Sequence, residues 1–263
     1  MHAAHSRTIP RMPSATFKDH FSRQSADYSR YRPGYTRELI AYLAALAPDR
    51  SLAVDCATGN GQAAVLLASH FDSVLAVDGS EAQLRQAMPH PRVRYERALA
   101  EVLPVPDRGV ALVAVAQAVH WFDFERFYAE CRRVLVPDGV LAAWTYTVFR
   151  AGGEADAVVD RFYHGTIGPY WPPERQYVQD QYRTLPFPWR EEVPPPFELQ
   201  TDWTLEQAMG YFASWSSVQR YKDIHGTDPL PRLQQDLAAA WPAGGTLRLK
   251  WPIHLRVGRA DPL

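Results

Sequence analysis

The chain has 263 residues, of which 46% are hydrophobic and 22% charged, and its formal net charge is −1. These proportions are typical of a folded protein with a sizeable core, and they exclude a wholly disordered chain. Nucleic-acid-binding proteins usually carry a clear basic excess, so the near-zero charge argues against nucleic acid as a partner.

The cysteine content and the N-terminal residues indicate the cellular compartment in which the protein is expected. Cys56 and Cys131 are too few for a disulfide framework, and neither has ligands nearby at the spacing of a metal site. We therefore expect a cytoplasmic protein without a bound metal. Residues 1–22 are polar and lack the apolar segment of a secretory signal, and no apolar run reaches membrane-spanning length. No membrane association is expected.

In chain order, residues 1–16 are predicted to form a flexible tail, and residues 17–47 become aromatic and then helical. From residue 51 to 146, short apolar segments alternate with helical ones. The expected strands are Leu52–Asp55, Val74–Asp78, Val93–Arg97, Val110–Gln117 and Val140–Tyr146. This alternation predicts an α/β fold with a doubly wound, mostly parallel sheet that is covered on both faces.

The composition changes after Arg150. Eight prolines stand between Pro169 and Pro196, interleaved with Trp and Tyr, and we expect the segment 151–196 to be an ordered insertion that caps the ligand-binding edge of the sheet. The segment 197–263 is expected to complete the sheet. Its expected elements are a helix from Thr204 to about Tyr221, a helix near Leu230–Trp241, and an antiparallel edge pair of Phe197–Trp203 with Leu247–Val257.

A glycine-rich turn follows the first expected strand. Asp55 ends the strand, Gly59 and Gly61 follow, and a helix opens at Gln62. Small residues let backbone amides approach a ligand, and a helix N-terminus favours an anionic group. Asp78 stands 23 positions after Asp55, at the end of the next strand, where a carboxylate can accept both ribose hydroxyls of a nucleoside.

Two kinds of nucleoside ligand fit this turn. Ala64 completes a dinucleotide fingerprint formally, so a nicotinamide-dependent oxidoreductase is one alternative. Asp55 argues against it, because a carboxylate beside the pyrophosphate would repel it, whereas the same carboxylate suits the ammonium group of an amino-acid moiety. We favour the nucleoside that carries an amino acid.

Further motifs add a family resemblance. From about Phe17 to Asp123, the chain resembles class I S-adenosylmethionine-dependent methyltransferases of the methyltransferase type 11 family, including relatives of trans-aconitate methyltransferase. The stretches that carry the resemblance are Tyr28–Tyr35, Asp55–Gln62, Ala100–Pro104, Gln117–Asp123 and Thr166–Arg175. It implies a Rossmann-like, seven-stranded sheet with an antiparallel edge pair and an inserted cap, and S-adenosylmethionine as methyl donor. The family's usual first glycine is Ala57 here, which is compatible with donor binding where φ is negative.

The resemblance also implies a donor site. Gly59 and Gly61 border the methionine end, Asp78 holds the ribose, and Gln117 lies next to the transferred methyl group. The whole implied set is Asp55, Ala57, Gly59, Gly61, Gln62, Asp78, Ala100, Glu101 and Gln117. Two structural alternatives stay open, because Glu101 suits an exposed loop and Gln117 suits hydrogen bonding to the backbone at a strand end.

Methyl transfer is an in-line displacement from an activated sulfonium, so the protein mainly aligns the reactants and excludes water. A general base is needed only for a protonated nucleophile, and His120 is the candidate, with a role in orienting its loop as the alternative. Arg32 and Arg175 could each anchor an anionic substrate bidentately, but for Arg175 we favour a solvated or weakly paired role. The candidate substrate-binding residues are Tyr28, Tyr31, Arg32, Trp121 and Trp171.

We therefore expect an enzyme that methylates a small molecule, at a carboxylate or a hydroxyl group, as a monomer or homodimer. The near-neutral charge and the aromatic insertion favour a small enclosed site. The alternatives are a non-catalytic module that binds S-adenosylmethionine or S-adenosylhomocysteine, and a methyltransferase that acts on a macromolecule.

Overall fold

A computed structural model describes residues 33–260 of the chain, and the remaining terminal residues lie outside the described part. The core is a twisted sheet whose parallel strands run, in spatial order, as β3 (Val93–Arg97), β2 (Ser73–Asp78), β1 (Leu52–Cys56), β4 (Val110–Ala116) and β5 (Leu135–Thr145). Antiparallel β8 (Leu247–Arg259) continues the sheet beside β5, and the short β6 (Arg190–Glu191) pairs with β8 at the edge. The α/β, Rossmann-like fold class is confirmed.

The central strands are buried because helices lie over both faces of the sheet. Residues 111–115 of β4 are all inaccessible to solvent, as expected for a continuous apolar strand covered on both sides. The covering helices of this part are α2 (Arg37–Leu46), α3 (Gln62–Leu67), α4 (Glu81–Leu84) and α5 (Phe124–Val134).

The last parallel strand starts earlier than expected. The strand was expected to start at Val140, yet β5 begins at Leu135. Its first part is irregular, because Asp138 has a φ of 57° and the pairing with β4 shifts register. The irregularity lies inside one strand, as in a β-bulge, and does not end it.

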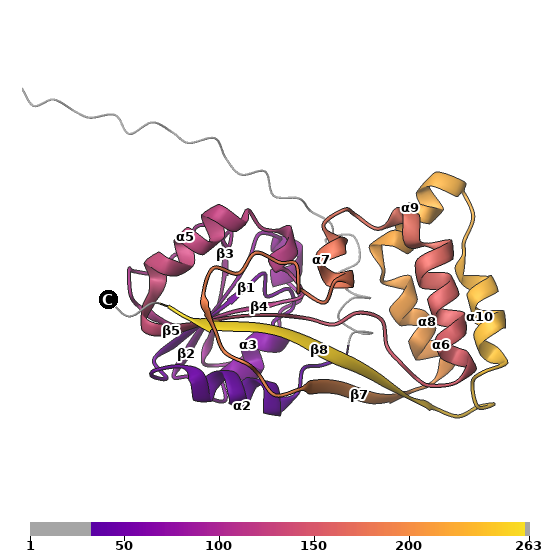
Figure 1. Cartoon of the computed structure of the whole chain (residues 1–263), viewed down its shortest axis with the longest axis horizontal. Coiled ribbons are helices and arrows are strands. Elements are labelled where there is room, and N and C mark those ends of the chain that lie inside the picture. Colours follow the sequence, from indigo (N-terminus) through magenta and orange to yellow (C-terminus); the bar gives the residue numbers. More distant parts are fainter. Residues whose placement is uncertain (1–32, 261–263) are drawn as a thin grey trace, which may run out of the picture.

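The long strand β8 pairs with two other long strands. Its C-terminal half pairs with β5, while its N-terminal half pairs with β7 (Phe197–Trp203), from Leu247 opposite Trp203 to Ile253 opposite Phe197. The predicted antiparallel pair is confirmed. Beyond the end of β5, these two strands form a ribbon that leads out of the sheet (Figure 1).

The ribbon leads to a helical lobe, visible on the right of Figure 1. The lobe consists of α6 (Glu154–Asp160), η3 (Arg161–Thr166), α8 (Leu205–Ala213), α9 (Ser216–His225) and α10 (Leu230–Ala238). The single helix expected to run from Thr204 to about Tyr221 is two helices, because the chain leaves the helix at Trp215, a buried residue of the lobe's aromatic core. Helices α8 to α10 come from the segment expected to complete the sheet, yet they belong to the lobe: α10 packs against α6, and Phe212 of α8 makes an edge contact with Phe162 of η3 at 5.8 Å.

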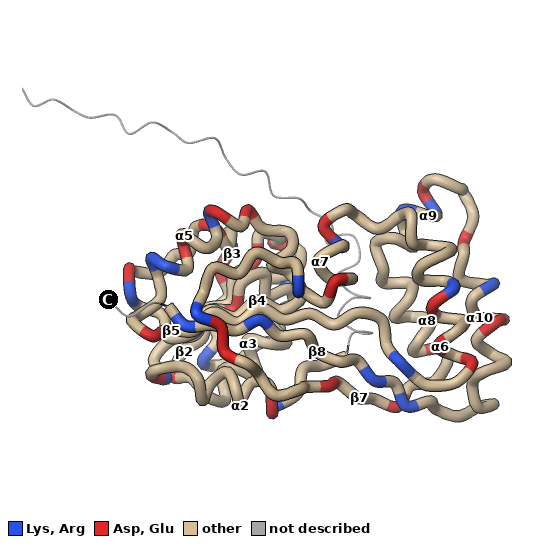
Figure 2. Tube along the Cα trace, in the orientation of Figure 1, with Lys and Arg blue, Asp and Glu red and all other residues tan. Residues whose placement is uncertain are grey.

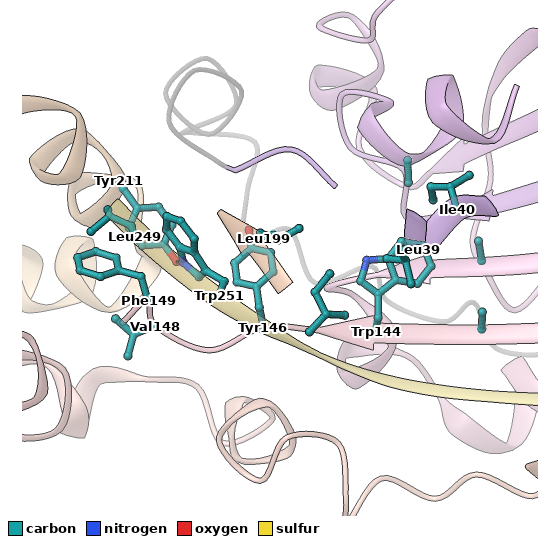
Figure 3. Packing of buried hydrophobic residues seen from close by; sticks show 14 of the residues in the cluster. Leu39, Ile40, Trp144, Tyr146, Val148, Phe149, Leu199, Tyr211, Leu249 and Trp251 are labelled. Carbon is teal, nitrogen blue, oxygen red and sulfur yellow. Dashed lines mark hydrogen bonds between the residues drawn. The ribbon is translucent and has the colours of Figure 1, made fainter. Parts of the chain in front are cut away.

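One hydrophobic core runs through both parts. Figure 3 shows Trp144 beside Leu39 near the sheet and Trp251 beside Tyr211 near the lobe. Both tryptophans are fully buried, and Trp251 also makes an edge contact with Phe149 at 5.6 Å. Because this cluster is continuous, the lobe is held rigidly to the sheet rather than tethered by the ribbon alone.

Charged side chains of both signs are interspersed along both parts of the chain (Figure 2). No helix among residues 33–260 is long and apolar enough to cross a membrane. The same residues contain no cluster of three or more His, Cys, Asp or Glu side chains that could hold a metal ion.

Candidate functional site

The glycine-rich turn and Asp78 come together at the carboxyl ends of β1 and β2. The Asp78 carboxylate accepts the backbone N–H of Gly59 at 2.9 Å and that of Ser80 at 2.8 Å. The backbone N–H of Thr58 donates to the carbonyl of Val77 at 2.9 Å. Asp78 therefore fixes the position of the turn from β1 relative to the end of β2.

The turn is tight, and three of its residues have a left-handed backbone. The φ angles are 53° at Ala57, 57° at Gly59 and 86° at Gly61. The expectation of a negative φ at Ala57 is wrong, because the chain must reverse between β1 and α3 within a few residues. An alanine in this region costs about 1–2 kcal/mol, which is strain of the kind often stored at functional sites.

Position 61 has no room for a side chain larger than that of glycine, because the ring of Tyr95 lies against it. A Cβ atom at this position would lie 2.2 Å from the hydroxyl oxygen of Tyr95, on β3. That hydroxyl donates a hydrogen bond to the carbonyl of Met88 at 2.6 Å, which fixes the ring over the turn. Nothing in the spacing of the turn points to Tyr95, because contact between them requires the pairing of three strands.

Asp55 is fully buried beneath the turn. It accepts the Thr58 hydroxyl at 2.5 Å. Burial raises the pKa of Asp55 to about 7, opposed by hydrogen bonds from Thr58 and the Ala64 amide, while the nearby Asp78 carboxylate raises it further. A cation bound close to Asp55 would favour its ionised form. The buried carboxylate and the amide-lined turn therefore fit a ligand with an ammonium group and a nucleoside.

The side chain of Gln117, at the end of β4, forms hydrogen bonds to residues at the end of β5. Its φ is 59°, its amide nitrogen donates to the carbonyl of Tyr146 at 3.2 Å, and its amide oxygen accepts the hydroxyl of Thr145 at 2.6 Å. These bonds match the structural alternative for this residue. A place for Gln117 beside the donor methyl stays a prediction.

Ala100 and Glu101, two further members of the implied donor set, lie in the loop between β3 and β4. Ala100 is buried there, and the Glu101 carboxylate accepts the backbone N–H of Asp123 at 3.0 Å. Asp123 is the N-cap of α5, so Glu101 joins this loop to the start of that helix. Gln62, the first residue of α3, is half-buried.

His120 lies in the short helix η2 (Val119–Trp121), directly after β4, and is 3% exposed. Its Nδ1 lies 2.9 Å from the hydroxyl of Tyr182, and its ring lies 4.6 Å from that of Trp121. Burial first, and the positive charge of Arg175 second, hold the pKa of His120 well below its usual range. The imidazole is therefore neutral at pH 7.

This lowered pKa makes stability depend on pH. The unfolded chain binds a proton at His120 below about pH 6.5, whereas the folded chain does not, so stability is lost as the pH falls below that value. We expect the free energy of unfolding to fall by about 1 kcal/mol more in the wild type than in His120→Gln between pH 7.5 and 5.5. Urea denaturation at both pH values measures this difference, and equal losses would contradict it.

Tyr182, the partner of His120, was not expected to take part. It is fully buried with a φ of 59°, and Gln181 before it has a φ of 58°. Arg256, on β8, donates to the carbonyl of Tyr182 at 2.7 Å and so holds this unusual backbone in place. Tyr182 lies in the proline-rich insertion, 62 positions from His120, so no local sequence signal links the two.

The candidate substrate residues are only partly described. Trp121 and Trp171 are both half-buried. The ring of Trp171 packs against Tyr163 and Trp215, with both centroid distances 5.5 Å. The other three candidates, Tyr28, Tyr31 and Arg32, lie outside the described residues.

Comparison with known proteins agrees with this geometry. Residues 54–143 match the family model described as a methyltransferase domain. The chain is 32% identical over 238 residues to a Dictyostelium discoideum protein named as a methyltransferase, covering 89% of this chain and 90% of the relative. It is 29% identical over 132 residues to a Saccharomyces cerevisiae protein named as an S-adenosylmethionine-dependent methyltransferase, covering 47% and 45% of the two chains.

Solved structures show the same relationship. A structure described as a type II methyltransferase from Anaeromyxobacter dehalogenans is 47% identical to this chain, with a TM-score of 0.83, and the match covers 89% of this chain and all of that one. The YcgJ protein of Bacillus subtilis, at 16% identity and a TM-score of 0.52, shares the fold.

Proposed function

The chain belongs to the S-adenosylmethionine-dependent methyltransferases of the methyltransferase type 11 family, and from that premise we propose that its acceptor is a small molecule, methylated at a carboxylate or hydroxyl oxygen. The observation that carries the proposal is the position of Trp171 and Tyr182. Both come from the insertion after β5, and Tyr182 contacts His120 next to the end of β4. An insertion packed against this end of the sheet favours a small enclosed acceptor over a macromolecule.

For the donor we propose the site implied by the resemblance. The Asp78 carboxylate holds the ribose hydroxyls, while the turn amides and the ionised form of Asp55 favour the amino-acid end. Its members are Asp55, Ala57, Gly59, Gly61, Gln62, Asp78, Ala100, Glu101 and Gln117. When bound, the donor supplies an activated methyl group, and the protein aligns the acceptor with it and excludes water.

His120 is the proposed base for a hydroxyl acceptor. A base with a strongly lowered pKa removes a proton only weakly near neutral pH, and a carboxylate acceptor needs no proton removal at all. Of the two acceptor groups, the surroundings of His120 therefore favour the carboxylate, with the imidazole positioned beside it as a neutral polar group.

We also propose a cytoplasmic monomer or homodimer. The support is that Cys56 and Cys131 are both free and fully buried, which suits a reducing compartment.

Titration with the donor product tests the proposed donor site. We expect isothermal titration with S-adenosylhomocysteine to give one site per chain with a dissociation constant in the micromolar range, or roughly −8 kcal/mol. The absence of both heat and a thermal shift at millimolar ligand would refute it. Binding without methyl transfer to any of a broad set of small acceptors would instead support the non-catalytic alternative.

A further inference from the structure

Arg175 is the first residue of α7 (Arg175–Gln179). Among residues 33–260, no carboxylate lies within ion-pair distance of its guanidinium, although twelve other ion pairs are present there. The guanidinium lies over the ring of Trp171 at 4.6 Å, and its one hydrogen bond in that range goes to the Tyr163 hydroxyl at 3.5 Å. The side chain is half-buried, and these contacts agree with the weakly paired role expected for it.

Arg175, Trp171 and Tyr163 form a cluster that contains two buried hydrogen-bond donors. The Nε atom of Arg175 and the indole Nε1 atom of Trp171 are both buried, and neither has a hydrogen-bond partner in the part of the chain that the structure describes. Leaving a buried donor unpaired costs about 1–3 kcal/mol, and more for a charged group. Both groups only donate. A ligand that satisfies them must therefore accept hydrogen bonds, and the positive charge of the guanidinium favours an anionic acceptor.

The cluster lies beside the proposed reaction site. Helix α7 packs against η2, and the positive charge of Arg175 is close enough to His120 to lower the pKa of the imidazole. Tyr163, the third member, is buried, and its ring lies 5.5 Å from that of Trp171. An anion held by these groups would thus lie next to His120 and the carboxyl end of β4.

We infer that Arg175, Trp171 and Tyr163 form an anion-binding subsite that holds a carboxylate group of the methyl acceptor. The inference rests on the proposed function and narrows it, because it makes the substrate an anionic small molecule. A planar guanidinium matches the two oxygens of a carboxylate better than any other side chain does. The ring of Trp171 holds the guanidinium in place by a cation–π contact.

Nuclear magnetic resonance tests the subsite directly, since the indole and guanidinium N–H groups give separate signals. Acetate, benzoate and succinate, each with its neutral amide as control, are titrated into ¹⁵N-labelled protein saturated with S-adenosylhomocysteine. Trp171→Phe assigns the indole signal. We expect at least one carboxylate to shift the signals of Trp171 Nε1 and Arg175 Nε to saturation, while its amide does not.

Variants identify the source of the effect. Arg175→Gln is expected to weaken carboxylate binding by at least about tenfold. Arg175→Lys should weaken it by less, because lysine keeps the charge but lacks the two parallel N–H donors of the guanidinium. Arg232→Gln, which removes an equal charge from the exposed side of α10, should bind as the wild type does. Each variant is first titrated with S-adenosylhomocysteine. Normal donor binding shows that the variant is folded, so that a change in carboxylate binding can be assigned to the subsite.

Three results would overturn the subsite: no saturable shift with any carboxylate, equal shifts with the neutral amides, or unchanged affinity in Arg175→Gln. Each is distinct from failure of the proposed function, which would appear as a wild-type protein that does not bind S-adenosylhomocysteine. Carboxylate binding that survives in Arg175→Gln would place any anion elsewhere.

Discussion

Asp78→Ala is expected to weaken the binding of S-adenosylhomocysteine by at least about tenfold, since hydrogen bonds to a charged group contribute about 1.5–3 kcal/mol. The loss has a second source. In the ligand-free protein the same carboxylate accepts the N–H groups of Gly59 and Ser80, at 2.9 and 2.8 Å. Alanine removes both acceptors, so the turn that surrounds the donor loses its fixed position as well. Isothermal titration measures the dissociation constant.

A control separates this site from a general charge effect. Glu81→Ala removes a carboxylate three positions further on, which is exposed and paired with Arg85 at 2.9 Å. This variant should bind S-adenosylhomocysteine as the wild type does. Thermal unfolding of both variants shows whether the fold is retained. A folded Asp78→Ala protein with an unchanged dissociation constant would leave Asp78 with only the structural role of joining the two loops.

Much of the fold was predictable because it depends on local signals. The order of strands and helices from β1 to β5 follows from short apolar segments with turns between them, and the capping box at Thr204 does mark the start of a helix. The helical lobe was not predictable in this way. Its assembly depends on Trp215 and Trp251, residues distant in sequence that pack in one aromatic core, and no local pattern shows which helices share it.

The same distinction applies to the site. Asp55, Gly59, Gly61 and Asp78 could be grouped as candidates because a backbone turn after a strand is a contiguous sequence feature. Tyr182 and Tyr95 act through contacts across the fold, and nothing in their local sequence indicates those contacts. Arg175 was a candidate anchor for an anion, but its contact with Trp171 was not predictable from the sequence. The backbone conformation at Ala57 could not be anticipated either, because an alanine gives no sign of a positive φ, whereas a glycine does.

Gly61→Ala is expected to destabilise the protein by about 2–5 kcal/mol, because two effects add. Overpacking costs about 1–3 kcal/mol, and here the new Cβ would lie 2.2 Å from the Tyr95 hydroxyl oxygen and 2.9 Å from its Cζ. The ring is held against the turn, because its hydroxyl donates a hydrogen bond to the carbonyl of Met88. The left-handed backbone, with a φ of 86°, adds about 1–2 kcal/mol. Urea denaturation measures the total.

Gly59→Ala isolates the backbone term. Its φ of 57° is also left-handed, but its Cβ would meet nothing closer than the Gln83 side-chain oxygen at 3.8 Å, so only about 1–2 kcal/mol should be lost. A double-mutant cycle then isolates the contact with the ring. In a Tyr95→Leu background, which removes the hydroxyl and Cζ, Gly61→Ala should cost no more than Gly59→Ala does in the wild type. If Gly61→Ala costs the same in both backgrounds, the ring of Tyr95 does not constrain the turn, and the requirement for glycine at position 61 comes from the backbone alone.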